Sequence, residues 1–164
     1  MESVIKKIIN KVPASDTNAR QQYKGERHAL ILLHNNKLGL ANYLGPGTNI
    51  IKRLIDNDPP RTYTDKIAKL HDINYCLSTY DQSKVQQLND IRHADTVMLN
   101  QLEISKLKKL DNKFNIAIGE KFIKSKVALE DVGILDRGKF TGSLNMYPEK
   151  YKSLFLREKS KLFK

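Results

Sequence analysis

The sequence has 164 residues, enough for one domain with a modest core, and its 29 Lys and Arg against 18 Asp and Glu give a formal net charge of +11. Because Cys76 is the only cysteine, no internal disulfide can form, which excludes a small fold held by disulfide bridges. No stretch approaches the ~20 apolar residues of a membrane span, and lysines interrupt the start of the chain where a signal peptide needs an apolar run. We therefore expect synthesis in the reducing cytoplasm and contact with a membrane only at its surface.

The positive charge is spread along the chain, with +3 in residues 1–35, +3 in residues 36–110 and +5 in residues 111–164. Such a balance suits a phosphate-rich partner, either nucleic acid or an anionic membrane surface. The same charge balance is also typical of a protein in which the positive charge serves only solubility. The charge by itself therefore leaves the class of partner open.

Apolar residues at helical spacing begin the chain, from Val4 to Ile9, and a polar segment follows Pro13. This pattern predicts an N-terminal helix and a polar linker over residues 1–35. The apolar run ALILL at residues 29–33 is either a strand or a helical turn, because periodicity does not decide for so short a run.

No regular pattern covers the residues from about 39 to 60, and a connection of that length in a compact domain is usually functional or disordered. Within it, YLGPG at residues 43–47 places two glycines around a proline. This arrangement fixes a tight backbone path whose carbonyl oxygens can converge on one point, and a hard cation such as calcium accepts a row of carbonyls. A plain surface turn is the other interpretation.

The double proline at residues 59–60 excludes a helix there, and Thr62 or Thr64 can cap a helix predicted over residues 65–78. A second apolar series steps by three or four residues. It predicts a helix that begins between residues 83 and 90 and ends near residue 110.

Further along the chain, a third helix is indicated by the apolar side chains Phe114, Ala117, Ile118 and Phe122. RGKFTGS at residues 137–143 predicts a turn before a basic stretch over residues 147–164. That stretch either attaches the protein to an anionic membrane or packs on the core through Tyr151, Leu154, Phe155 and Leu162. Together these elements predict a mainly α-helical fold.

Two polar residues fall on apolar helix stripes. His71 lies within the stripe of the helix predicted over residues 65–78, and Asp95 takes the position between Ile91 and Met98 in the next helix. A buried carboxylate costs several kcal/mol unless it is paired. We therefore expect Asp95 to accept the imidazole N–H of His71, to fix its tautomer and to leave the other ring nitrogen as a base. A core histidine satisfied by a nearby acid is the alternative.

Asp72 and Tyr75 extend this pair. Asp72 follows His71 by about 100° round the helix and must point to one side. If the YLGPG loop packs on that side, Asp72 supplies the negative charge that neutral carbonyls lack for holding calcium. Tyr75, one turn after His71, lies above the same face and can donate its O–H to Asp95 or close the site.

The ordered set YLGPG, PPRTYTD, KIAKLHDINY and HAD resembles the phospholipase A2 domain of parvovirus minor capsid proteins, which is similar to secreted phospholipases A2. The resemblance covers about residues 40–105. It implies a mainly α, disulfide-free fold of two antiparallel helices and a glycine-rich calcium loop. We expect three parts: an N-terminal helix and polar linker (1–35), the phospholipase A2-like core (36–110) and a basic helical extension (111–164).

In that family, loop carbonyls and the aspartate after the histidine bind Ca²⁺, and the histidine activates water to cleave the sn-2 ester of a glycerophospholipid. By position, the resemblance implies Ca²⁺ ligands at the backbone oxygens of Tyr43, Gly45 and Gly47 and at the carboxylate of Asp72. It implies catalytic roles for His71 as base, Asp95 as its partner and Tyr75 as support. It further implies an anionic glycerophospholipid membrane as partner, and a viral source in which a virion component breaches host membranes.

One departure concerns TNIIKRLIDNDP, between the glycine loop and Pro60, which is longer than we expect for the viral domains. We expect residues 48–60 to bulge or to add contacts with the membrane. The resemblance implies nothing for residues 1–35 or for those beyond about Leu110.

Two other classes of function fit part of the sequence. A helical nucleic-acid- or scaffold-binding protein explains the charge but gives His71, Asp72 and Asp95 no role. Its basic patch would comprise Lys106, Lys108, Lys109, Lys121, Lys124 and Lys126. An HD-type phosphohydrolase would hold a transition metal with His28 or His34 as the first ligand, and gives YLGPG no role.

Overall fold

The computed structural model describes residues 26–81, 83–135 and 147–164. The predicted N-terminal helix, most of the polar linker and the predicted turn at residues 137–143 lie outside these residues. Within them the chain is mainly helical, as predicted, with a small sheet. The elements are β1 Leu30–Leu32, β2 Leu38–Leu40, α3 Ile50–Ile55, α4 Tyr63–Ser78, α5 Lys84–Lys108, α6 Lys113–Asp131, a 3₁₀ helix Glu149–Tyr151 and α7 Lys152–Lys161.

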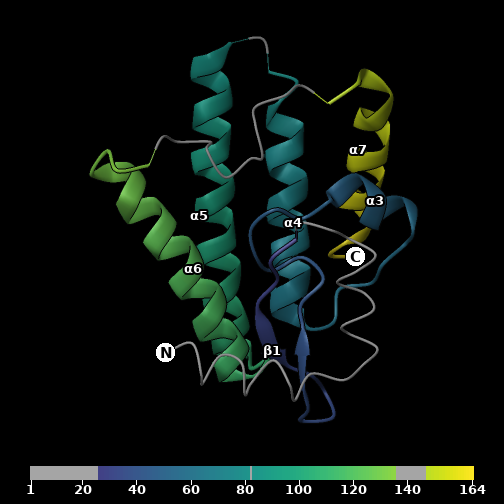
Figure 1. The fold of residues 1–164 in the computed structure, drawn as a ribbon, viewed down its shortest axis with the longest axis vertical. Coiled ribbons are helices and arrows are strands. Elements are labelled where there is room, and N and C mark those ends of the chain that lie inside the picture. Colours follow the sequence, from purple (N-terminus) through teal and green to yellow (C-terminus); the bar gives the residue numbers. More distant parts are fainter. Residues whose placement is uncertain (1–25, 82, 136–146) are drawn as a thin grey trace.

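Two antiparallel helices, α4 and α5, lie side by side at the centre of the molecule (Figure 1), which confirms the predicted pair. Each begins at a capping side chain: Thr62 accepts a hydrogen bond from Asp65 N at 3.2 Å, and Ser83 accepts one from Gln86 N at 3.1 Å. The left-handed backbone of Lys109, with φ 53°, closes α5. None of the helices in the described part of the chain is long and apolar enough to cross a bilayer.

The strands β1 and β2 form an antiparallel hairpin in which Ile31 pairs with Gly39. The run at residues 29–33 therefore contains a strand and not a helical turn. The side chain of Asn115 on α6 fixes the hairpin, because it accepts a hydrogen bond from Leu32 N at 2.7 Å and donates one to Leu32 O at 2.8 Å. This contact joins the first described segment to the third long helix.

The connection between β2 and α4 contains the short helix α3, so the expectation of an irregular segment over residues 39–60 was wrong. The side chain of Asn49 caps α3 by accepting a hydrogen bond from Lys52 N at 3.3 Å. Ile50 and Leu54, which are one helical turn apart, are both buried in the core. Because α3 is too short to be stable by itself, this burial is what favours the helix.

The helix α6 crosses α5 and approaches the start of α4 closely (Figure 1). A Cβ at Gly119 would lie 3.1 Å from Thr64 Cγ2 and 3.2 Å from Leu102 Cδ2, so this glycine allows the close approach. The predicted helix is confirmed, and the apolar residues that indicated it do not mark its most buried face, because Phe114 is half exposed. The face that packs inward carries Ile116, Gly119, Ile123 and Lys126.

The C-terminal helix α7 lies against α4 on the side away from α5 (Figure 1). Phe155 and Leu162 are buried in the core, and Lys69 on α4 forms an ion pair with Glu158 on α7 at 3.7 Å. The stretch at residues 147–164 therefore packs on the core, which was one of its two interpretations.

Candidate active site

His71 on α4 and Asp95 on α5 meet in the interior, as predicted. The distance between His71 Nε2 and Asp95 Oδ1 is 2.8 Å, and the two residues are only 6% and 1% exposed. Because an ionised carboxylate only accepts hydrogen bonds, Nε2 carries the proton and donates it. The other ring nitrogen, Nδ1, faces Asp72, whose Oδ1 lies 3.6 Å away.

Two further side chains donate to Asp95. The Tyr75 hydroxyl donates to Oδ1, which confirms a contact predicted for this residue, and its ring centroid lies 4.1 Å from that of His71. Lys126 on α6 donates from Nζ to Asp95 Oδ2 at 2.8 Å. Asp95 is therefore held at both carboxylate oxygens, by side chains from α4 and α6.

Lys126 does not belong to a surface patch, and its assignment to one was wrong. The residue is only 2% exposed, because its stem packs inside and its ammonium lies between Asp95 and Glu130, 2.6 Å from Glu130 Oε1. The sequence did contain a signal for this position, since Lys126 falls at helical spacing after Gly119 and Ile123 on the buried face of α6.

The contacts shift the pKa values of the pair in opposite directions. Burial by itself would raise the pKa of the Asp95 carboxyl, but the hydrogen bonds from His71, Lys126 and Tyr75 lower it below its usual value. Burial by itself would lower the pKa of His71, but Asp72 and Asp95 outweigh it and raise that pKa. The arrangement therefore favours an ionised Asp95 that can stabilise a protonated His71.

The glycine loop (residues 43–47) is fixed to α4 by Asp65. The carboxylate of this fully buried residue accepts hydrogen bonds from the backbone N–H groups of Asn42 at 3.0 Å, Tyr43 at 2.8 Å and Leu44 at 2.9 Å. Sequence reasoning missed this role of Asp65, which is also the acid of the first turn of α4. The same helix thus positions the loop and carries His71.

A second contact holds the loop against the segment before β1. Ala29 N donates to Leu44 O at 2.8 Å. A Cβ at Gly45, where φ is 143°, would lie 2.8 Å from His28 Cα and closer still to Arg27 O, so only glycine fits here. Gly47, with φ 79°, also adopts a conformation that favours glycine.

Two of the predicted ligand carbonyls converge on one point. The hydroxyl of Thr48, which sequence reasoning missed, lies 3.2 Å from Tyr43 O and 3.4 Å from Gly45 O. Thr48 also lies beside Asp72: burial raises the pKa of the Asp72 carboxyl, and His71, Thr48 and His28 oppose this shift. The loop therefore packs on the side of α4 to which Asp72 points, which is the condition under which Asp72 could supply charge to a cation at the loop.

These residues fit a calcium ion. The buried oxygen Asp72 Oδ2 has no hydrogen-bond partner among the described residues, and carbonyl and carboxylate oxygens are the ligands that calcium prefers. No group of three or more His, Cys, Asp and Glu side chains in the described segments could hold a metal. The chain's own ligands would therefore be one carboxylate and several backbone oxygens.

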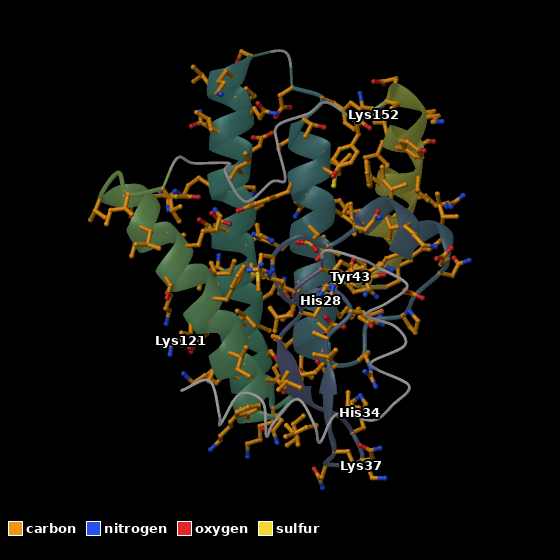
Figure 2. All side chains as sticks on the ribbon, viewed as in Figure 1. His28, His34, Lys37, Tyr43, Lys121 and Lys152 are labelled. Carbon is orange, nitrogen blue, oxygen red and sulfur yellow. The ribbon has the colours of Figure 1, made fainter. Side chains whose placement is uncertain are left out.

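The two other candidate histidines lie elsewhere (Figure 2). His28 is buried and its Nε2 lies 2.9 Å from Glu26 Oε2, while Arg53 Nη2 lies 2.6 Å from the same oxygen. His34 is exposed near Lys37 at the end of the hairpin. His28 thus belongs to a buried ion-pair cluster beside the glycine loop, and His34 does not approach His71.

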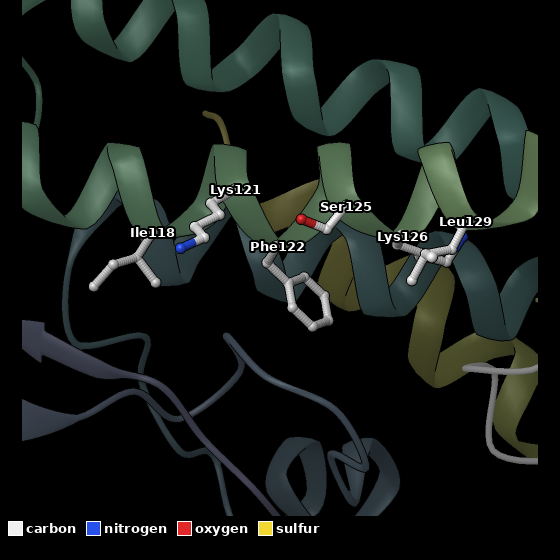
Figure 3. Close-up of a pocket in the computed structure, with 6 residues that line it drawn as sticks. All are labelled: Ile118, Lys121, Phe122, Ser125, Lys126 and Leu129. Carbon is white, nitrogen blue, oxygen red and sulfur yellow. The ribbon is translucent and has the colours of Figure 1, made fainter. Parts of the chain in front are cut away.

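A groove of about 390 Å³ runs along one side of α6 (Figure 3). The described residues that line it are Ile118, Lys121, Phe122, Ser125, Lys126 and Leu129. Because Lys126 also contacts Asp95, the groove begins one side chain away from the His71–Asp95 pair.

The sequence matches the family described as "Phospholipase A2-like domain" over residues 35–126, which is more than half of the chain. The matched range contains the glycine loop, His71 and Asp95 and ends at Lys126. The domain limits expected at residues 36 and 110 stay a prediction. No curated protein and no solved structure matches the chain. The chain belongs to the phospholipase A2-like domain family, of the parvovirus type.

Proposed function

We propose that this protein is a calcium-dependent phospholipase A2 that hydrolyses the sn-2 acyl ester of glycerophospholipids at a membrane surface. The observation that carries the proposal is the 2.8 Å contact between His71 and Asp95, beside a loop of carbonyl oxygens and the Asp72 carboxylate. Membership of the phospholipase A2-like family supports it, because that family is one of phospholipase-type hydrolases.

In the proposed reaction, His71 Nδ1 accepts a proton from a water molecule whose oxygen forms a bond to the ester carbonyl carbon. The bond to the sn-2 oxygen then breaks, and the same proton passes from Nδ1 to that oxygen. The products are a lysophospholipid and a fatty acid. Asp95 stabilises the imidazolium between the two steps and keeps Nδ1 pointed away from itself.

The residues that would hold calcium are Tyr43, Gly45 and Gly47, through their backbone oxygens, and Asp72. When bound, calcium supplies a Lewis acid for the ester carbonyl and a counter-charge for the oxyanion. Thr48, whose hydroxyl approaches the same carbonyl oxygens, is positioned to contact a water in that site. Among these residues, Asp72 faces Nδ1 of His71, where the proposed proton transfer takes place, and Thr48 lies beside Asp72.

We further propose that the end of α5, the start of α6 and the turn between them (residues 106–114, the basic turn) face an anionic membrane. Leu107 and Phe114 are 74% and 49% exposed there. Exposed lysines surround them: Lys106, Lys108, Lys109 and Lys113. Asp111, the acid of this turn, points inward and accepts a hydrogen bond from Thr64 N at 2.6 Å. The turn thus presents apolar and basic groups outward, which suits an anionic bilayer surface.

The parvovirus type of the family supports a viral role, in which the protein is a component of the virion and opens a host membrane. The net charge of +11 is compatible with both a membrane surface and packaged nucleic acid. The basic turn favours the membrane, because exposed apolar side chains accompany its lysines.

The test is to incubate the protein with mixed glycerophospholipid vesicles and to detect lysolipid and free fatty acid by mass spectrometry, with and without a calcium chelator. We expect calcium-dependent release of both products by the parent protein. His71→Asn should lower the rate by about 10²- to 10⁴-fold with the helical circular dichroism intact, because the base is lost. Undiminished turnover in this variant, or no turnover by the parent protein, would contradict the proposed function.

A further inference from the structure

The hydrogen bonds at Asp95 are divided unequally between its two oxygens. His71 Nε2 and the Tyr75 hydroxyl both donate to Oδ1, whereas Lys126 Nζ donates to Oδ2 at 2.8 Å. Rotation about the Cβ–Cγ bond would move both oxygens, so the contacts at Oδ1 and the contact at Oδ2 oppose it together. The contact of Lys126 with the second oxygen fixes the plane of the carboxylate, and through it the direction of the His71 ring.

Lys126 also orders the aromatic side of the pair. Its ammonium lies 5.2 Å from the centroid of the Tyr75 ring, and that ring lies 4.1 Å from the ring of His71. A cation over an aromatic face is attracted to it, most strongly where water is excluded. Lys126 therefore contacts both groups that hold His71 in place.

The position of Lys126 is itself set by a second carboxylate. Lys126 Nζ lies 2.6 Å from Glu130 Oε1, one turn further along α6, and Arg92 on α5 lies 3.9 Å from Glu130 Oε2. The side chains of Lys126, Asp95 and Glu130 are each 1% exposed. A buried ion pair often adds little net stability compared with apolar residues of similar size, so stability is a weak reason for this arrangement.

We propose that Lys126 is a positioning residue for the His71–Asp95 pair: it orients the Asp95 carboxylate, and thereby holds Nδ1 of His71 toward the glycine loop. The proposal rests on the proposed phospholipase function for its effect on turnover. It does not rest on that function for its effect on the His71 ring, which can be measured without substrate.

The test uses Lys126→Met, which keeps the length of the stem and removes the ammonium. In this variant the buried Glu130 carboxylate loses its ion-pair partner Lys126. The double variant Lys126→Met/Glu130→Gln is therefore made as well, so that no new unpaired charge remains. The matched control is Lys124→Met, which removes the same charge from an exposed side chain on the same helix. Turnover on vesicles is resolved into kcat and KM, and the Nε2–H proton of His71 is followed by NMR.

We expect kcat to fall by about 10- to 100-fold in both Lys126 variants, less than the ~10⁴-fold that replacement of the partner acid by an amide costs in a His–Asp pair. KM should change by less than about twofold, because the buried Lys126 does not reach the bilayer. The Nε2–H resonance should move from its parental position in both variants. Lys124→Met should match the parent protein in kcat, KM and resonance position.

The proposal is overturned if both Lys126 variants retain the parental kcat and resonance, or if Lys124→Met loses as much activity as they do. A double variant that does not fold would also overturn it, because Lys126 would then serve the fold. If the parent protein hydrolyses no lipid, the proposed function fails, and the resonance alone decides the role of Lys126. A shifted resonance would then support the positioning role.

Discussion

The two sides of the His71 ring are built in different ways. At Nε2, Asp95 receives hydrogen bonds from the His71 ring, from Tyr75 and from Lys126, so that both carboxylate oxygens are held. At Nδ1, the neighbour is the Asp72 carboxylate, whose buried Oδ2 has no hydrogen-bond partner among the described residues. The Nε2 side is thus completed by side chains of the chain itself, and the Nδ1 side keeps a carboxylate oxygen without such a partner, as the proposed calcium site requires.

The difference extends to what fixes each side. Side chains at helical spacing on three packed helices define the Nε2 side, whereas backbone hydrogen bonds to Asp65 and the close contact at Gly45 define the Nδ1 side. Backbone groups held in this way are pre-organised, because no rotamer has to be ordered when a ligand binds. We therefore expect substitutions of residues on the Nε2 side to affect mainly turnover. Substitutions of residues on the Nδ1 side should affect mainly calcium binding.

Asp72→Asn should have the largest effect on the Nδ1 side. Asp72 carries the charge of the proposed ligand set, and an amide keeps its size and one oxygen but not the charge that offsets the dehydration of a divalent ion. We expect calcium affinity, measured by calorimetry, to fall by about 100-fold or more. At 100 times the Kd, calcium should stabilise the parent protein by about 2.7 kcal/mol and the variant far less, seen as a smaller rise in Tm.

Asp56→Asn is the matched control, since Asp56 lies outside the loop and pairs with Lys52 on α3 at 2.7 Å. It should bind calcium as the parent protein does. Equal calcium binding by the parent protein and Asp72→Asn would show that the glycine loop and Asp72 do not form one site. The distinction between the two sides of His71 would then fail as well.

The sequence allowed the Nε2 side to be predicted in part. A histidine and an aspartate at apolar positions of two neighbouring helices had to pair, since an unpaired buried acid is costly. The contacts of His71 and Tyr75 with Asp95 follow from that argument. Lys126 did not follow, because a lysine is normally assigned to the surface and because the residues that indicated this helix, such as Phe114, do not mark the buried face that carries Ile123.

For the Nδ1 side, the sequence predicted which residues take part but not the contacts that hold them in place. The glycines of YLGPG indicated a tight path, but its attachment to Asp65 and to residues 27–29 depends on long-range contacts that no local pattern contains. The helix α3 was missed for a related reason. Its apolar residues do recur one helical turn apart, but a segment of 6 residues is too short for that spacing to predict a helix, and burial of Ile50 and Leu54 against the rest of the core favours its conformation.

Glu26 offers a second test of the Nδ1 side of His71. Here the expected effect is on the free energy of unfolding. Burial alone would raise the pKa of Glu26, but hydrogen bonds from His28, Arg53 and Asn49 N lower it from 4.5 to about 2. A folded-state pKa below the unfolded value means that this carboxylate contributes fully above about pH 4.5 and loses the contribution as pH falls toward 2. The pH-dependent part is about 3 kcal/mol.

Glu26→Gln should therefore be less stable than the parent protein at pH 6, and the difference should shrink steadily between pH 4.5 and pH 2.5 in urea unfolding experiments. Glu103→Gln is the control, because Glu103 is exposed and its pair with Lys106 spans 3.9 Å. A difference between Glu26→Gln and the parent protein that stays constant over this range would show that ionisation of Glu26 does not hold the loop side together.

The smallest effect is expected at the basic turn, which tests whether the loop side of His71 faces the bilayer. The hairpin that leads into the glycine loop is joined to α6 by Asn115, directly after this turn. Lys108→Gln should weaken binding to anionic vesicles by about 1 kcal/mol, roughly fivefold, and leave binding to neutral vesicles unchanged, as measured by co-sedimentation.

The control is Lys84→Gln, which removes the same charge from the opposite end of α5 (Figure 1) and should change binding to neither kind of vesicle. If both variants lose anionic binding equally, the charge of the whole molecule and not the basic turn attracts the membrane, and the loop side has no preferred orientation toward it.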